Sequence, residues 1–85
     1  MPVFAQKDQT FVLALRVRNR ADLAPEVQEI ITKYGSEILG RFGIPSSDKQ
    51  RGLIVLVMED AEAVTRLAEE LQEIVDLQVK TIAFD

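Results

Sequence analysis

The segment GRFGIPSSDKQRG at residues 40–52 combines glycines with basic side chains, the composition of loops that bind phosphate. A P-loop requires a second glycine, then a lysine, then a hydroxyl residue. Counted from Gly43, these positions hold Asp48, Lys49 and Gln50. An acid repels phosphate, and Pro45 removes one backbone N–H from such a loop. The sequence therefore excludes a P-loop here.

The four residues GRFG at 40–43 also match the GxxG pattern with which KH domains clamp a nucleic-acid backbone. That loop joins two helices, whereas too few residues separate Pro45 from the next expected strand to form a helix. The charge of the chain also argues against nucleic-acid binding. Residues 52–85 hold two basic and eight acidic side chains, and the whole chain has a net charge of −4. We expect no direct nucleic-acid binding, and we predict that residues 40–52 form an edge strand and a connecting loop.

Catalytic and metal chemistry is restricted by composition, because the chain has no histidine and no cysteine. It therefore lacks the usual general base, a thiolate nucleophile and the commonest transition-metal ligands. Glu69, Glu70 and Glu73 could gather a cation, but they are expected on the solvent face of a helix, opposite Leu67 and Leu71. We expect no enzyme activity, no metal and no cofactor.

Three arginines are candidates for binding an anionic ligand or an acidic partner. Arg16 and Arg18 share one face of an expected strand, and Arg41 lies in the expected edge strand. Arginines at strand ends also occur in solvent or in weak surface ion pairs, and this alternative stays open. Beside Arg41, Gly43 would let a backbone approach a ligand, or would permit an unusual turn before Pro45.

The first half of the chain predicts strand, helix, strand. Residues 10–20 alternate with a period of two, which places Phe11, Leu13, Leu15 and Val17 on one face of a strand. A helix is expected within residues 21–35, with Asp22 as its N-cap and Gly35 as the residue that follows its end. Residues 37–45 then form a short edge strand, weakened by two glycines and closed by proline.

The second half repeats this order. Residues 53–58, LIVLVM, are apolar at every position, which is typical of a central strand. Asp60 is the expected N-cap of a helix over 61–76, whose buried positions are predicted to be Val64, Leu67, Leu71 and Val75. Residues 77–85 form the last strand.

The element order is therefore βαββαβ, which predicts an α+β ferredoxin-like sandwich: a four-stranded antiparallel sheet with two helices on one face. We expect a single domain over residues 1–85, with residues 1–9 as an N-terminal lead-in. No apolar run is long enough for a membrane span or a signal peptide, so we expect a cytoplasmic protein without a membrane partner.

Two helices on one face leave the other face of the sheet open. Strand 53–58 must present either Leu53, Val55 and Val57 or Ile54, Leu56 and Met58 to that side. We assign the open face provisionally to Ile54, Leu56 and Met58, together with Val12 and Ala14. Because a large exposed apolar patch usually marks an interface, we predict a homo-oligomer, dimer or tetramer.

Two short motifs carry a family resemblance. Arg41, Gly43 and Pro45 form an R-x-G-x-P pattern, and Val79, Lys80 and Thr81 form a closing V-K-T strand. In this order and spacing, the chain from Thr10 onward resembles the ACT-like family of bacterial iron-only hydrogenase system regulators. The resemblance implies a stand-alone regulatory domain, similar in fold to the C-terminal domain of the nickel-responsive repressor.

Domains of that kind bind small effectors at subunit boundaries, so the resemblance implies a small-molecule effector near Arg41 and Gly43. Nickel sensing does not carry over, since the repressor's histidine and cysteine ligands are absent. Regulation of transcription would require a partner that contacts DNA. The alternative is a ligand-free structural oligomer or adaptor that recruits a protein partner through its acidic helix face and edge strand.

Overall fold

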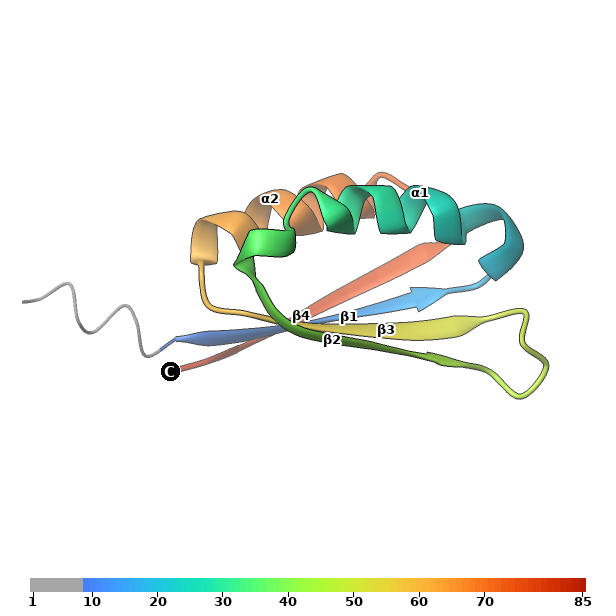
Figure 1. Ribbon diagram of the computed structural model, residues 1–85, viewed down its shortest axis with the longest axis horizontal. Coiled ribbons are helices and arrows are strands. Elements are labelled where there is room, and N and C mark those ends of the chain that lie inside the picture. Colours follow the sequence, from blue (N-terminus) through green and yellow to red (C-terminus); the bar gives the residue numbers. More distant parts are fainter. Residues whose placement is uncertain (1–8) are drawn as a thin grey trace, which may run out of the picture.

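The protein is represented by a computed structural model, in which residues 9–85 are described; the rest of the expected lead-in lies outside the described residues. The elements are β1 (Thr10–Val17), α1 (Arg20–Thr32), the short 3-10 helix η2 (Gly35–Glu37), β2 (Ile38–Pro45), β3 (Gly52–Met58), α2 (Ala61–Gln72) and β4 (Leu77–Phe84). Both helices cover one face of the sheet, as Figure 1 shows. The predicted ferredoxin-like α+β sandwich is confirmed.

The strand order in the sheet is β2-β3-β1-β4, and every neighbouring pair is antiparallel. Each helix connects a central strand to an edge strand, so the two halves of the chain interlock through β1 and β3. This order confirms that residues 38–45 form an edge strand and that the apolar run 53–58 is central. The register of the β2–β3 pairing shifts between Ile38 and Gly40.

The core lies between the helices and one face of the sheet. From β1 it receives the predicted set Phe11, Leu13, Leu15 and Val17, all of them buried. Residues paired directly across an antiparallel ladder lie on the same face of the sheet. The helix-facing residues of β3 are therefore those paired with this set: Met58 with Phe11, Leu56 with Leu13, and Ile54 with Leu15.

This register corrects the provisional assignment of the open face. Leu56 and Met58 are completely buried against the helices, and Ile54 packs against the same core. They cannot form an interface on the opposite side, because neighbouring residues of a strand point to opposite faces. The open face instead holds Leu53, Val55 and Val57, and it includes Val12 and Ala14 as predicted.

The start of α1 differs from the prediction. The N-cap is Asn19, whose side chain accepts the backbone N–H of Asp22, so the helix starts earlier than expected and Pro25 lies inside it. Gly35 does not terminate the helix in a left-handed conformation; it begins η2, and no described glycine has a positive φ.

The α2 helix is confirmed at its start and shorter than predicted at its end. The side chain of Asp60 accepts the backbone N–H groups of Glu62 and Ala63, as an N-cap does. The chain then leaves the helix after Gln72 and turns at Asp76, where φ is 69°. Val75 is therefore 78% exposed rather than buried. No helix within residues 9–85 has the length and apolar character needed to cross a membrane.

Candidate functional site

A small cavity of about 160 Å³ lies beside α1, near the end of β2 and the start of β3. Two of the predicted ligand-binding residues, Gly43 and Pro45, line it. Its walls are mostly apolar, and the apolar residues that line it come from four elements: Val17, Ala24, Ile44, Leu53 and Ile54. One amide side chain, that of Gln28 in α1, also lines the cavity. The cavity thus combines apolar walls with a single side-chain amide.

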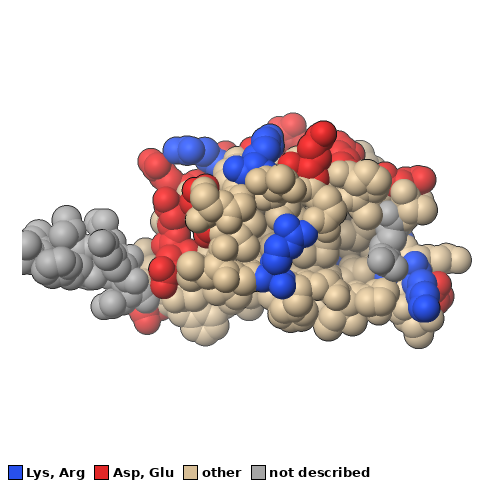
Figure 2. Space-filling model, in the orientation of Figure 1, with Lys and Arg blue, Asp and Glu red and all other residues tan. Residues whose placement is uncertain are grey.

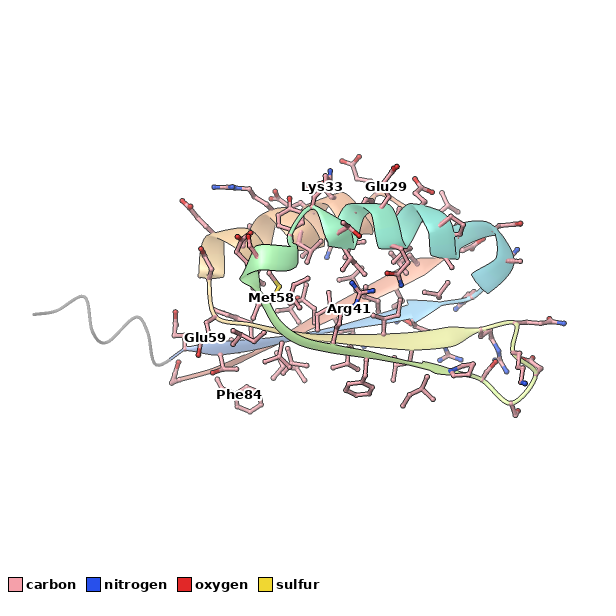
Figure 3. All side chains as sticks on the ribbon, in the orientation of Figure 1. Glu29, Lys33, Arg41, Met58, Glu59 and Phe84 are labelled. Atoms are coloured by element: carbon pink, nitrogen blue, oxygen red, sulfur yellow. The ribbon has the colours of Figure 1, made fainter. Side chains whose placement is uncertain are left out.

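Arg41 joins this site through Gln28. Its register partner in β3 is Leu56, so it lies on the helix side of the sheet, where Figure 3 shows it between β2 and α1. Its Nη2 donates a hydrogen bond to the Gln28 Oε1 atom. Within the described part of the chain Arg41 forms no ion pair, so its positive charge is not neutralised by a carboxylate. An arginine in this state has donors available for an anionic group.

Gly43 is not needed for backbone geometry. Its φ is not positive, and a Cβ built on it would lie 3.8 Å from the Leu53 carbonyl oxygen and 3.9 Å from the Ile54 Cγ1 atom, which are ordinary contacts. The suggested unusual turn before Pro45 is therefore wrong. What the missing side chain does provide is space, because a larger residue at this position would occupy part of the cavity.

The other two predicted ligand residues lie elsewhere. Arg16 is on the open face of the sheet, paired with Leu53 and Gln78, whereas Arg18 follows the end of β1 and does not share a strand face with it. Neither residue lines the cavity. A role for Arg16 and Arg18 in anion binding stays a prediction. Sequence reasoning also missed Gln28, because nothing in the helix pattern shows which of its side chains lies over β2.

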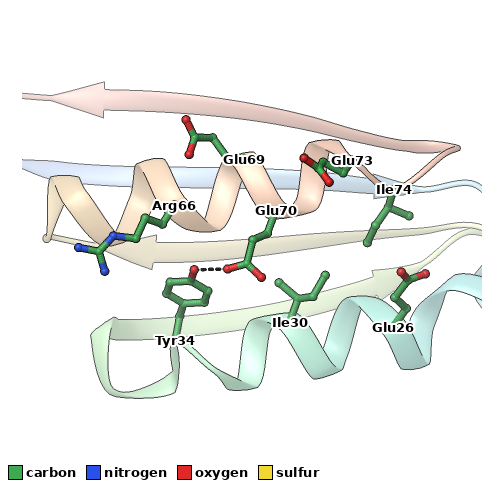
Figure 4. Close-up of a pocket in the computed structure, with 8 residues that line it drawn as sticks. All are labelled: Glu26, Ile30, Tyr34, Arg66, Glu69, Glu70, Glu73 and Ile74. Atoms are coloured by element: carbon green, nitrogen blue, oxygen red, sulfur yellow. Dashed lines mark hydrogen bonds between the residues drawn. The ribbon is translucent and has the colours of Figure 1, made fainter.

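A second hollow is the groove between α1 and α2, with a volume of about 600 Å³ (Figure 4). Arg66, Tyr34 and two isoleucines line it, together with four glutamates: Glu26, Glu69, Glu70 and Glu73. The Tyr34 hydroxyl donates to Glu70 Oε2, and the Lys33 ammonium donates to Glu70 Oε1. Glu70 was expected on a solvated face, but it is partly buried and links the two helices.

These contacts determine the protonation states in the groove. The hydrogen bond from Lys33, followed by the one from Tyr34, lowers the pKa of Glu70. The hydrogen bond to Glu70, followed by burial, raises the pKa of Tyr34. At neutral pH the pair therefore stays as a carboxylate and a protonated phenol, which suits a structural link. Among residues 9–85 no three acidic, histidine or cysteine side chains are placed to hold a metal ion.

In the loop between β2 and β3, the carboxylate of Asp48 forms hydrogen bonds within the loop itself. Asp48 Oδ1 accepts hydrogen bonds from the Ser46 hydroxyl and from the Gln50 backbone N–H, the latter at 3.0 Å. These bonds, led by that of Ser46, lower the pKa of Asp48. The backbone N–H that a phosphate would need is thus satisfied by a carboxylate within the loop, and residues 40–52 form the predicted strand and connection.

Two helices on one face of a β2-β3-β1-β4 antiparallel sheet define the ferredoxin-like fold, an arrangement that ACT domains share. The ACT domain of GTP pyrophosphokinase from Chlorobium tepidum has this fold, with a TM-score of 0.61 and 10% identity over 86% of this chain and 84% of that one. A putative PII-like signaling protein from Thermus thermophilus matches with a TM-score of 0.62 and 15% identity over 89% and 88% of the two chains.

The uncharacterized protein TM1266 from Thermotoga maritima is more similar, with a TM-score of 0.82 and 25% identity over 92% of this chain and all of that one. Residues 9–81 match the TM1266-like family, whose description is "Iron-only hydrogenase system regulator, putative". The chain belongs to this family. No curated protein matches the chain.

Proposed function

We propose that this chain is a regulatory domain that binds a small carboxylate-bearing effector in the cavity beside Arg41, and that it acts in the regulation of an iron-only hydrogenase system. Family membership supports the regulatory role. The observation that carries the effector proposal is a mostly apolar cavity next to an arginine that has no carboxylate partner among the described residues.

The volume of the cavity limits the ligand. A cavity of about 150 Å³ holds a molecule the size of benzene, so about 160 Å³ suits the apolar part of an amino acid or of a short carboxylic acid. The ligand carboxylate would replace the Gln28 side-chain oxygen as the hydrogen-bond acceptor of the Arg41 guanidinium. The new hydrogen bond would be charge-assisted. The Gln28 amide would then be released to bind a second polar group of the ligand.

Thermal unfolding in the presence of amino acids and short monocarboxylates tests this proposal. A ligand at a hundred times its Kd stabilises the folded state by about 2.7 kcal/mol, because it binds only that state. Gly43→Val, which fills part of the cavity, and Arg41→Gln, which removes the charge, are expected to abolish the stabilisation. Arg66→Gln is the matched control, since that arginine lies in α2, outside the cavity. Equal stabilisation of the wild type and Gly43→Val would contradict the proposal.

The acidic groove favours a second candidate function, that of an adaptor that recruits a basic segment of a protein partner. Four glutamates line this groove, and a basic peptide is complementary to such a surface. If no amino acid, carboxylate, nucleotide or metal ion stabilises the fold, the adaptor is favoured over the effector-binding domain. The absence of enzyme activity, the cytoplasmic location and the lack of direct nucleic-acid binding stay predictions.

A further inference from the structure

The open face of the sheet is the side not covered by α1 and α2. Five of its large apolar side chains are between 40% and 54% exposed, and they come from β2, β3 and β4: Phe42, Ile44, Leu53, Ile82 and Phe84. Figure 3 shows Phe84 on the opposite side of the sheet from the buried Met58. Val55 and Val57 lie between them on the central strand. A continuous apolar surface of this kind marks a protein interface.

Charge on this face is distributed along the strands. The charged side chains at its register positions are basic, Arg16 and Lys80, and Arg16 lies at the end where β3 begins. Glu59 follows Met58, at the opposite end of the sheet, and is exposed. With about 3.3 Å per residue, Arg16 and Glu59 lie about 20 Å apart along the strands. Figure 2 shows acidic side chains at the left end of the view, and basic together with acidic side chains at the right end.

We propose that the open face binds a second copy of this chain, with the two sheets stacked face to face and their strands antiparallel. Arg16 of each copy then lies over Glu59 of the other. Stacked sheets related by a two-fold axis have two arrangements, with the axis parallel or perpendicular to the strands. A parallel axis places Arg16 over Arg16 and Glu59 over Glu59, which repels at both ends. A perpendicular axis pairs opposite charges at both ends, with the apolar side chains between them and Lys80 at the β4 edge.

A second copy is the occupant that matches both properties of the face. An apolar surface can pack against the same surface of a second copy. When that copy is rotated by a half-turn, the opposite charges at the two ends of the surface also face each other. Aligned stacking at an angle of about 30° is the usual packing of two sheets. The argument for this assignment does not rest on effector binding, because it uses residues on the opposite face of the sheet from Gln28 and Arg41.

The first experiment measures mass in solution by sedimentation velocity at micromolar concentration. The wild type is expected to be at least a dimer, and Ile82→Glu is expected to be a monomer, because it places a charge on the apolar face. Val75→Glu is the matched control, since it makes the same change at an exposed residue outside that face. Circular dichroism confirms folding of each variant. A monomeric wild type, or an oligomeric Ile82→Glu, would overturn the proposal and leave the face to a different protein.

The second experiment tests the orientation by exchanging charges. Arg16→Glu alone and Glu59→Arg alone are each expected to raise the dissociation constant of the dimer about tenfold, because both symmetric pairs become repulsive. The double variant Arg16→Glu/Glu59→Arg is expected to restore wild-type affinity. With the two-fold axis parallel to the strands, the single variants would leave like charges facing each other as before. Unchanged affinity in the single variants, or failure of the double variant to recover, would overturn the antiparallel arrangement.

Discussion

Glu70 shows how one residue connects the two helices that cover the core. Its carboxylate accepts hydrogen bonds from Lys33 and Tyr34, which follow the end of α1, so it fixes the α2 helix against that end. The helix pattern alone predicts a solvent-facing position, because Glu70 precedes the buried Leu71. Its partners lie 36 and 37 residues earlier in the sequence, and no local spacing signals such a contact.

Tyr34 provides a direct test of this contact, because it is the only tyrosine and the chain has no tryptophan. Its pKa is raised above 10.0, so its hydrogen bond stabilises the fold fully below pH 10 and is lost as pH rises through the folded-state pKa. Ultraviolet titration of the tyrosinate is expected to show a raised pKa in the wild type and a value nearer to 10 in Glu70→Gln. Glu69→Gln, which changes a neighbour not bonded to Tyr34, is the control; an equal shift in both variants would contradict the assignment.

The pKa of Glu70 gives the corresponding prediction in acid. Because it is lowered below 4.5, the contribution of the ionised carboxylate is complete above pH 4.5 and is lost as pH falls through the folded-state pKa. Urea unfolding as a function of pH is expected to show a smaller loss of stability on acidification in Glu70→Gln than in Glu69→Gln. If the two variants have the same pH dependence, Glu70 does not contribute through its charge.

The α2 helix is the element whose packing is most clearly defined by its sequence. Leu67 and Leu71 are completely buried, whereas Val75, one turn further on, is exposed because the helix has already ended. Leu67→Ala is expected to reduce the free energy of unfolding by about 2–5 kcal/mol, through lost burial and the cavity that remains. Val75→Ala is expected to change it by less than about 0.5 kcal/mol. Urea unfolding measures both, and a large effect of Val75→Ala would place that residue in an interface.

The elements differ in how much the sequence can predict about them. Alternation in β1 identifies Phe11 and Leu13 as core residues. The opposite face of that strand includes the charged Arg16, so the two faces differ in polarity. In β3 every position is apolar, so the sequence does not distinguish Leu56, in the core, from Val55, on the open face. Only pairing with β1 decides between them. The order and type of the elements follow from local patterns, whereas faces and helix ends depend on tertiary contacts.

The candidate site was predictable only in part for the same reason. Gly43 and Pro45 stand out as glycine and proline in a strand, and both line the cavity. Gln28 is an ordinary helical residue, and its place in the site depends on how α1 lies over β2. The chemistry of the individual residues could be foreseen, but not which of them the fold brings together.

At the scale of the whole molecule, 85 residues give a core of limited size, so association through the open face would supply part of the stability. The melting temperature of the wild type is then expected to rise with protein concentration, because unfolding is coupled to dissociation. Ile82→Glu is expected to melt at a lower temperature that does not depend on concentration. Calorimetry over a hundredfold range of dilution measures both, and a wild-type melting temperature independent of concentration would contradict association.

Ile44 and Leu53 line the cavity as residues of β2 and β3, while their side chains lie on the open face of the same strands. A molecule that enters the cavity from the helix side and shifts these strands moves the two side chains, and so changes the surface that a second copy contacts. Because coupling between two binding events is reciprocal, association changes the affinity for that molecule by the same factor. Dilution, which dissociates the protein, then changes its apparent affinity for the ligand. The cellular concentration of the domain therefore helps to determine the ligand concentration to which it responds.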